Sequence, residues 1–151
     1  MKYLKKEVVF AEHPEHVSLA FQITQCPNKC NGCHSPELRE DIGEEINTTK
    51  FNYILDKYDG LIDNVIFFGG DHLVDEMKEL LVCAHMRGLK TTLWSGKDHI
   101  EDSLIGYLDY LKLGGFDERV GGLESENTNQ KYFEVKTGRK ISIRKQHETN
   151  F

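Results

Sequence analysis

The chain has 151 residues and a formal net charge of −6, with 38% hydrophobic and 29% charged residues. That length fits one globular domain, and no apolar run reaches the roughly 20 residues that a membrane-spanning helix needs. The acidic balance argues against nucleic acid, because few cations are available to displace counterions from phosphates. We therefore expect a single domain over residues 1–151, located in the cytoplasm, with no nucleic-acid or membrane partner.

The charges are distributed unevenly along the chain. Residues 37–79 hold twelve acidic and four basic side chains, whereas residues 131–151 hold six basic and two acidic ones. We interpret the second stretch as a basic C-terminal segment. Solvated surface is the simpler interpretation of both stretches, and a surface that docks a charged partner is the alternative.

Strand and helix patterns alternate along the chain. Apolar residues at every second position predict a strand over 17–23, and apolar spacing of three and four residues after Asn47 predicts a capped helix over 51–58. The continuous apolar run over 65–68 is typical of a strand buried on both faces. The pattern continues with a helix over 73–84 and a strand over 89–94. A second helix over 98–108 follows, opened by a capping-box variant of Asp98 and Glu101, and a last strand covers 110–113. This order indicates an α/β fold, with βαβ units around a mostly parallel sheet.

Ligand sites in such folds gather where the parallel strands end. Three of the predicted strands end in residues that can carry chemistry. Cys26 follows the first strand, Gly69-Gly70-Asp71 follows the second, and Trp94-Ser95-Gly96 closes the third. We expect the functional site at this edge of the sheet.

Three thiols stand within eight residues, in the segment Cys26-Pro-Asn-Lys-Cys30-Asn-Gly-Cys33. Thiolates are soft ligands, so zinc and iron–sulfur clusters are the candidates. Structural zinc usually takes two separated pairs of ligands, and the chain has no second C-x2-C pair. Electron-carrying clusters use four cysteines, and this loop has three. Three ligands on a [4Fe–4S] cluster leave one iron open to a substrate, so the pattern favours a catalytic cluster over zinc.

Other potential ligands are less convincing. His34 directly follows Cys33, and neighbouring side chains in an extended loop point apart. Cys83 lies on the helical stripe over 73–84, where a buried core thiol is the simpler interpretation. His13 and His16 flank Pro14 and are interpreted as surface histidines.

The glycine loop and the tryptophan each allow two interpretations. Gly69-Gly70-Asp71 can be an ordinary strand-to-helix turn in which Asp71 caps the helix. It can also let a ligand approach the backbone closely, because glycine has no side chain and amides at a helix start bind polar groups. Trp94 can be a core aromatic residue or part of the lining of a cofactor pocket.

Together, the cysteine loop and the glycine loop one helix later resemble the radical S-adenosylmethionine superfamily. Within it, the chain is similar to the activating components of anaerobic ribonucleoside-triphosphate reductases, over about residues 12–135. The similarity rests on four motifs: residues 26–36, Gly69-Gly70-Asp71, Trp94-Ser95-Gly96 and Thr128-Asn129-Gln130. The chain departs from the family at 12–16, where many members have Asn-Gly-Pro-Gly, at His72, where Pro is common, and at Ser95, where Thr is common.

The resemblance implies a shortened (βα) partial barrel that holds one [4Fe–4S] cluster and S-adenosylmethionine. The implied cluster ligands are Cys26, Cys30 and Cys33, and the implied S-adenosylmethionine-binding residues are Gly69, Gly70, Asp71, Trp94, Ser95 and Gly96. Reductive cleavage of S-adenosylmethionine would yield a 5′-deoxyadenosyl radical, which takes a hydrogen atom from a glycine of the reductase's catalytic subunit. That chemistry needs no catalytic acid or base from the chain, and a flavodoxin-like or other low-potential donor would supply the electron.

Two alternatives to this function stay open. The first is activation of another glycyl-radical enzyme, of the pyruvate formate-lyase type. The second is a non-catalytic metal-binding or electron-transfer module, which the missing fourth loop cysteine disfavours.

Overall fold

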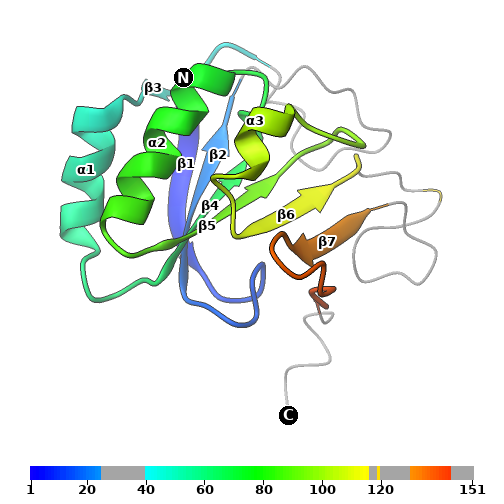
Figure 1. Cartoon of the computed structure of the whole chain (residues 1–151). Coiled ribbons are helices and arrows are strands. Elements are labelled where there is room, and N and C mark those ends of the chain that lie inside the picture. The colour runs from blue at the N-terminus through cyan, green and yellow to red at the C-terminus, as the bar shows by residue number, and fades with distance from the viewer. Residues whose placement is uncertain (25–39, 116–118, 120–129, 144–151) are drawn as a thin grey trace.

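The computed structural model describes residues 1–24, 40–115, 119 and 130–143 (Figure 1). These residues form a seven-stranded sheet with helices packed on one of its faces. The strand order across the sheet is β3-β1-β2-β4-β5-β6-β7. The strands are β1 (Lys2–Val9), β2 (Ser18–Ile23), β3 (Glu44–Glu45), β4 (Asn64–Phe68), β5 (Lys90–Trp94), β6 (Tyr110–Leu113) and β7 (Lys131–Glu134), and the helices are α1 (Thr48–Lys57), α2 (Val74–Met86) and α3 (Asp102–Ile105).

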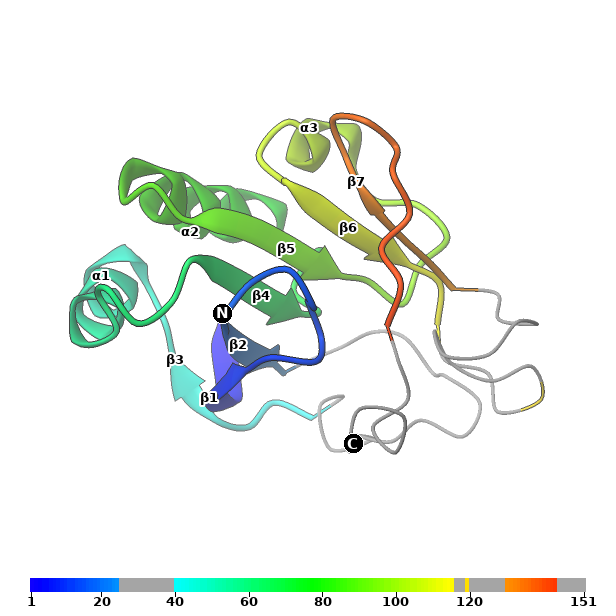
Figure 2. The same ribbon diagram turned by 90° about the horizontal axis from the view of Figure 1, so that it is seen from below.

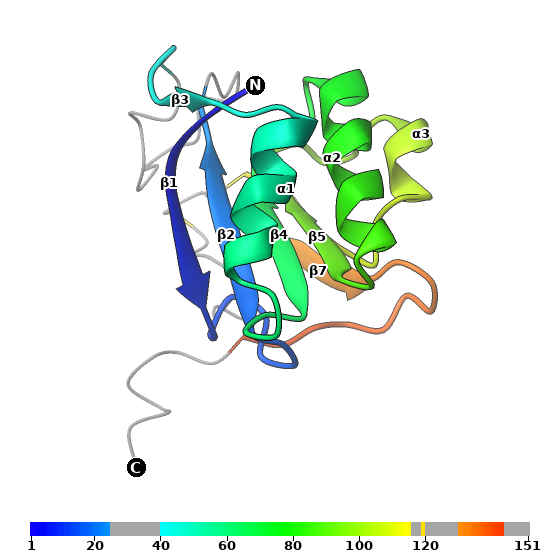
Figure 3. The same cartoon turned by 90° about the vertical axis from the view of Figure 1, so that its left-hand side faces the viewer.

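The sheet is mixed, with a parallel centre and antiparallel borders. β2, β4, β5 and β6 run parallel to one another, and helical connections join each of these strands to the next. β1 and β3 extend the sheet antiparallel on one side, and β7 extends it antiparallel on the other. Parallel neighbours need such crossover connections, so α1, α2 and α3 all lie on the same face (Figures 2 and 3).

Most predicted elements are present where local signals are strong. The helix predicted after Asn47 is confirmed as α1. Asn47 is its N-cap, and the Asn47 side chain accepts a hydrogen bond from the Lys50 N–H at 2.9 Å. The strand predicted over 65–68 is confirmed as β4, which is buried along nearly its whole length. The helical stripe over 73–84 forms α2, with Met77, Leu80, Leu81 and Ala84 buried.

Two expectations about local structure were wrong. The helix predicted over 98–108 is reduced to the four residues of α3. The predicted capping box of Asp98 and Glu101 is absent, because α3 has Glu101 and not Asp98 at its N-cap, and no side chain caps it. Ile100, Leu104 and Leu108 are nevertheless buried, so the apolar spacing marked core contacts, two of which are made by residues outside the helix. The charged segment of β1 carried no strand signal, since its Lys and Glu side chains face solvent beside the edge of the sheet.

The core lies between the sheet and the helices. Phe21, Phe51 and Phe67 form its aromatic centre, with ring centroids 5.6 to 5.8 Å apart. α1 and α2 lie side by side over this centre (Figure 3). The opposite face of the sheet is also covered, since Ala20 and Ile66 are fully buried there beside Phe68 and Trp94. Strands buried on both faces explain why β4 reads as a continuous apolar run.

No helix in the described ranges has both the length and the apolar character that crossing a membrane requires.

Candidate functional site

The parallel strands bring the predicted site residues to one edge of the sheet. β4 ends at Phe68, just before the glycine loop, and β5 ends at Trp94. β2 ends at the same edge at Ile23, three residues before Cys26. The predicted cluster ligands Cys26, Cys30 and Cys33, together with His34 and Asn129, lie outside the described residues.

Both glycines of the loop require the left-handed backbone region. Gly69 has φ of 89° and Gly70 has φ of 95°, and the Gly69 N–H donates a 2.9 Å hydrogen bond to the Trp94 carbonyl. A Cβ at Gly70 would lie 2.7 Å from Cε of Met77 and 3.3 Å from Ile23 side-chain carbons. The missing side chain of Gly70 therefore makes room for the core. At Gly69 the nearest atom would be 3.7 Å away, so that side of the loop is less crowded.

Asp71 does not cap the helix that follows it. α2 begins at Val74, its N-cap is Leu73, and no side chain caps it. The Asp71 side chain is nevertheless buried, at 6% exposure, with one oxygen 3.9 Å from Nζ of Lys97. A buried carboxylate is costly unless something compensates its charge, so the turn interpretation leaves this residue unexplained.

A cavity of about 490 Å³ opens beside Asp71, between the start of α2 and the loop that follows β5. That volume falls within the range of small-molecule sites. Its lining is mostly polar and charged and consists of Asp71, His72, Val74, Lys97, His99, Ile100, Glu101 and Asp102.

Two lining residues, His72 and Lys97, were given no role from the sequence and stand out in the structure. Burial lowers the pKa of His72, and neither of its ring nitrogens has a hydrogen-bond partner in the described part of the chain. Lys97 is held by a turn in which its N–H donates to Oγ of Ser95 at 3.1 Å. His72 could have been noticed as a departure from the family motif, whereas Lys97 becomes significant only through its approach to Asp71.

Trp94 belongs to the apolar face opposite the helices. Its ring makes edge-to-face contacts with Phe68 and Tyr132, at centroid distances of 4.9 and 5.6 Å. Nζ of Lys112 lies 5.4 Å from the ring centroid, within cation–π range. The indole N–H is buried without a hydrogen-bond acceptor among the described residues. Trp94 therefore presents an apolar ring on this face, beside the Tyr132 side chain.

Two remaining candidates have structural partners. Gln130 donates through Nε2 to the carbonyl of Gly114 at 3.2 Å, and this hydrogen bond joins Gln130 to the residue directly after β6. Cys83 is half-buried at the border of the core, and its Sγ lies 3.5 Å from Nδ2 of Asn52.

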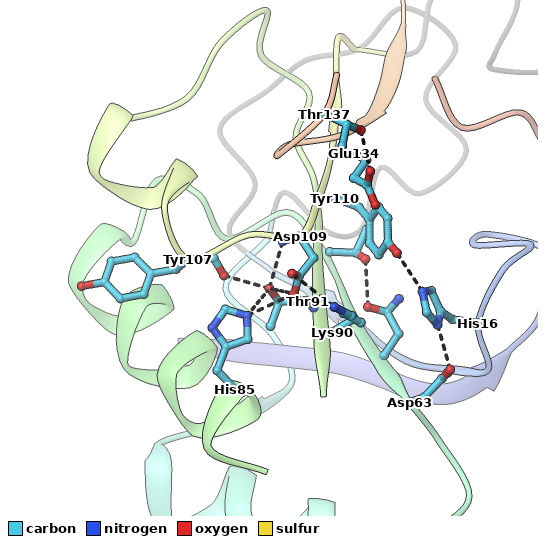
Figure 4. Close-up of polar contacts among 12 residues, drawn as sticks. His16, Asp63, His85, Lys90, Thr91, Tyr107, Asp109, Tyr110, Glu134 and Thr137 are labelled. Carbon is cyan, nitrogen blue, oxygen red and sulfur yellow. Dashed lines mark hydrogen bonds and ion pairs between the residues drawn. The ribbon is translucent and has the colours of Figure 1, made fainter. Parts of the chain in front are cut away.

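A second polar cluster lies at the opposite edge of the sheet, where the parallel strands begin. The interpretation of His13 as a surface residue was wrong, because its side chain is fully buried and burial lowers its pKa to about 4. His16 is half-buried, with Nδ1 2.7 Å from Oδ2 of Asp63 and Nε2 2.8 Å from the Tyr110 hydroxyl (Figure 4). Only the folded chain reveals this cluster, because Asp63 and Tyr110 are far from the histidines in sequence.

Comparison with known protein families addresses the iron–sulfur interpretation. The model of the 4Fe-4S single cluster domain family matches residues 16–113, about two thirds of the chain. The chain therefore belongs to this family, whose cluster agrees with the iron–sulfur interpretation of the three cysteines. No curated protein and no solved structure matches the chain.

Proposed function

We propose that this protein is a radical S-adenosylmethionine activase of an anaerobic ribonucleotide reductase. One electron and one S-adenosylmethionine yield methionine and a 5′-deoxyadenosyl radical. That radical takes a hydrogen atom from a glycine Cα of the reductase, leaving a glycyl radical and 5′-deoxyadenosine. A low-potential donor of the flavodoxin type supplies the electron.

The family assignment supports the cluster on which this reaction depends. Cys26, Cys30 and Cys33 are the proposed ligands, and when bound the cluster transfers the electron that splits the sulfonium C–S bond. The described part of the sheet supports the position of this segment, because β2 ends three residues before Cys26 at the edge that carries the glycine loop.

Asp71 is the observation that carries the proposal for S-adenosylmethionine. Its carboxylate is buried, does not cap a helix and lines a cavity at the edge where the cysteine segment begins. The methionine end of S-adenosylmethionine carries an ammonium, a sulfonium and a carboxylate. Asp71 suits the positive groups and Lys97, 3.9 Å away, suits the carboxylate, so the described residues fit this ligand.

The neighbouring residues hold these two charges in place. The hydrogen bond from Gly69 to the Trp94 carbonyl ties the glycine loop to the end of β5. The buried Ser95 side chain accepts from the Lys97 N–H and orders the turn that carries Lys97. Trp94 and Phe68 supply apolar surface, and excluding water from this edge would protect a carbon radical from side reactions.

We further propose that the parallel run β2-β4-β5-β6 is a shortened partial barrel of the radical S-adenosylmethionine type. The covered face opposite the helices supports this, because Ala20 and Ile66 are fully buried there. In such a barrel that face is the interior, and Trp94 lies on it.

The first test measures the reaction without a partner. Anaerobically reconstituted protein, reduced with dithionite, should release methionine and 5′-deoxyadenosine in equal amounts. Asp71→Asn removes a charge-assisted contact of about 1.5–3 kcal/mol, so S-adenosylmethionine should bind roughly 10- to 100-fold more weakly while the iron content stays normal. Asp75→Asn is the matched control, because Asp75 is an exposed carboxylate on the first turn of α2. If Asp71→Asn and Asp75→Asn cleave S-adenosylmethionine at the same rate, Asp71 does not contact S-adenosylmethionine.

The second test identifies the partner. Adding anaerobic ribonucleotide reductase to the reduced protein and S-adenosylmethionine should yield a glycine-centred radical signal in electron paramagnetic resonance. A formate-lyase-type enzyme in a parallel assay should give none. A signal on the formate-lyase-type enzyme alone would reassign the partner, and protein that takes up zinc but no iron during reconstitution would contradict the activase function altogether.

A further inference from the structure

A set of potential metal ligands lies away from the proposed cofactor edge. Ser18, Asn64 and Tyr110 are the first residues of the parallel strands β2, β4 and β6, and His13 and His16 lie in the segment that leads into β2. β4 has five residues, and at about 3.3 Å per residue it separates the two edges by roughly 15 Å. Any ligand bound beside the histidines is therefore distinct from one bound at the glycine loop.

The chain brings three donor groups together within four residues. The His16 N–H donates to the His13 carbonyl at 3.1 Å, and this turn places the two imidazole rings 4.8 Å apart between centroids. One ring nitrogen from each histidine and one carboxylate oxygen of Glu15 all lie within 4.8 Å of one another. Ligands of a tetrahedral zinc ion with bonds of about 2.0–2.1 Å stand roughly 3.4 Å apart, so small side-chain rotations would close the site.

His13 has an unused nitrogen inside the protein. The side chain is 0% exposed, and Nε2 has no hydrogen-bond partner in the part of the chain that the structure describes. Its other nitrogen, Nδ1, lies 3.4 Å from the Glu15 backbone nitrogen, beyond the usual 2.7–3.2 Å of a good hydrogen bond. In this contact the Glu15 N–H donates and Nδ1 accepts, so the ring proton lies on Nε2 when no ion is bound. Because the contact is long, giving it up to move the proton to Nδ1 costs little, and Nε2 would then present its lone pair to a cation. A bound cation would satisfy a buried polar atom that otherwise costs stability.

His16 and Glu15 are oriented as metal ligands are. The Asp63 carboxylate accepts from Nδ1 of His16 at 2.7 Å, so Nε2 is the acceptor nitrogen, and it accepts from the Tyr110 hydroxyl at 2.8 Å (Figure 4). A metal ion at Nε2 would replace this second hydrogen bond. A carboxylate on the second nitrogen is the usual support of a metal-binding histidine. Arg139 donates to both oxygens of Glu15, at 2.6 and 2.9 Å, and lone pairs remain on those oxygens for a cation.

We propose that His13, Glu15 and His16 form a second metal site, which binds a divalent ion of the zinc class. Two imidazoles and a carboxylate are borderline donors that suit zinc better than calcium or magnesium. Through Glu15 and Arg139, the ion would join the segment between β1 and β2 to the chain after β7. The site involves none of the residues assigned to the activase reaction, so it stands or falls separately from the proposed function.

The main test counts zinc in the full chain carrying its reconstituted cluster. After incubation with ZnSO₄ and desalting, the unaltered protein should retain one zinc per chain in addition to the cluster iron. His13→Gln and His16→Gln should each reduce retained zinc at least fivefold. His99→Gln should retain the zinc, since His99 is an exposed histidine that does not belong to the group of His13, Glu15 and His16. No zinc beyond the cluster metal, or equal retention in all three variants, would overturn the proposal.

A second test excludes the cysteines as the source of bound metal. The full chain with Cys26→Ser, Cys30→Ser and Cys33→Ser is titrated with CoCl₂. Visible d–d bands without a thiolate charge-transfer band should appear at one equivalent, and they should vanish when His16→Gln is added. If His16→Gln unfolds by circular dichroism, Glu15→Gln replaces it, because Glu15 is exposed and its loss should weaken cobalt binding about tenfold. A titration with no d–d bands contradicts the site.

Discussion

An alanine at Gly70 would be opposed by both the backbone and the core. Its φ of +95° lies in the region that L-residues avoid, which costs about 1–2 kcal/mol. The new Cβ would also stand 2.7 Å from Cε of Met77, the movable end of a flexible side chain, and 3.3 Å from two Ile23 carbons. Overpacking therefore adds about 1 kcal/mol, the low end of its usual range. Gly70→Ala should therefore destabilise the fold by about 2–3 kcal/mol.

Gly69→Ala separates the two contributions. Gly69 has φ of +89°, but its nearest neighbour would be 3.7 Å from the new Cβ, so only the backbone cost of about 1–2 kcal/mol applies. In a Met77→Leu background, which lacks the Cε atom, the cost of Gly70→Ala should fall toward that of Gly69→Ala. The coupling between positions 70 and 77 measures the overpacking.

Thermal unfolding of matched preparations, with equal cluster content, provides the assay. One kcal/mol corresponds to about 2–4 °C for a domain of this size, so Gly70→Ala should lower Tm by about 4–12 °C and Gly69→Ala by about 2–8 °C. Equal losses for the two variants, with no rescue by Met77→Leu, would refute the reasoning. The result also bears on activity assays of Gly70 variants. If Gly70→Ala destabilises the core, a loss of activity in that variant is no evidence that Gly70 contacts a ligand.

Three further predictions concern the cluster, pH and docking. Cys30→Ala should abolish a stable cluster, whereas Cys83→Ser should keep about four irons per chain by colorimetric assay, since Cys83 contacts only the border of the core. With chelator present, Tm should fall as the pH falls from 6.5 to 4, because burial lowers the pKa of His13 to about 4 and the unfolded chain binds the proton more readily. His13→Gln should flatten this part of the pH profile, and an unchanged slope in that variant would contradict the role of His13. Rising salt should slow activation of the partner while cleavage without partner stays constant, and Lys136→Gln with Lys140→Gln, both exposed, should reduce that salt dependence if the C-terminal segment is the docking side.

Local sequence signals predicted the centre of the fold well. α1 and β4 followed from patterns contained within twelve residues, an Asn cap with an apolar stripe and an unbroken apolar run. β1 was missed because a strand beside a sheet edge keeps charged side chains in solvent and shows no apolar alternation. β7 was missed for a related reason, since its residues were interpreted as the start of a basic segment.

The site shows the same division between local and distant information. The cysteine spacing needed no folded structure, because three thiols within eight residues are already close enough to share one cluster. The sequence left Asp71 with two interpretations, an N-cap and a ligand contact, and the structure removed the first. Its burial, its approach to Lys97 and the shifted start of α2 are tertiary facts.

The sequence by itself thus determined the iron–sulfur character of the chain and the order of its central strands and helices. Both depend on residues that are neighbours along the chain, where spacing dictates geometry. Only the tertiary structure decided that Gly70 faces the core, that His13 is buried, and that His16 lies between Asp63 and Tyr110. Those contacts join residues as many as 94 positions apart, and they exist because parallel strands align their ends at a common edge.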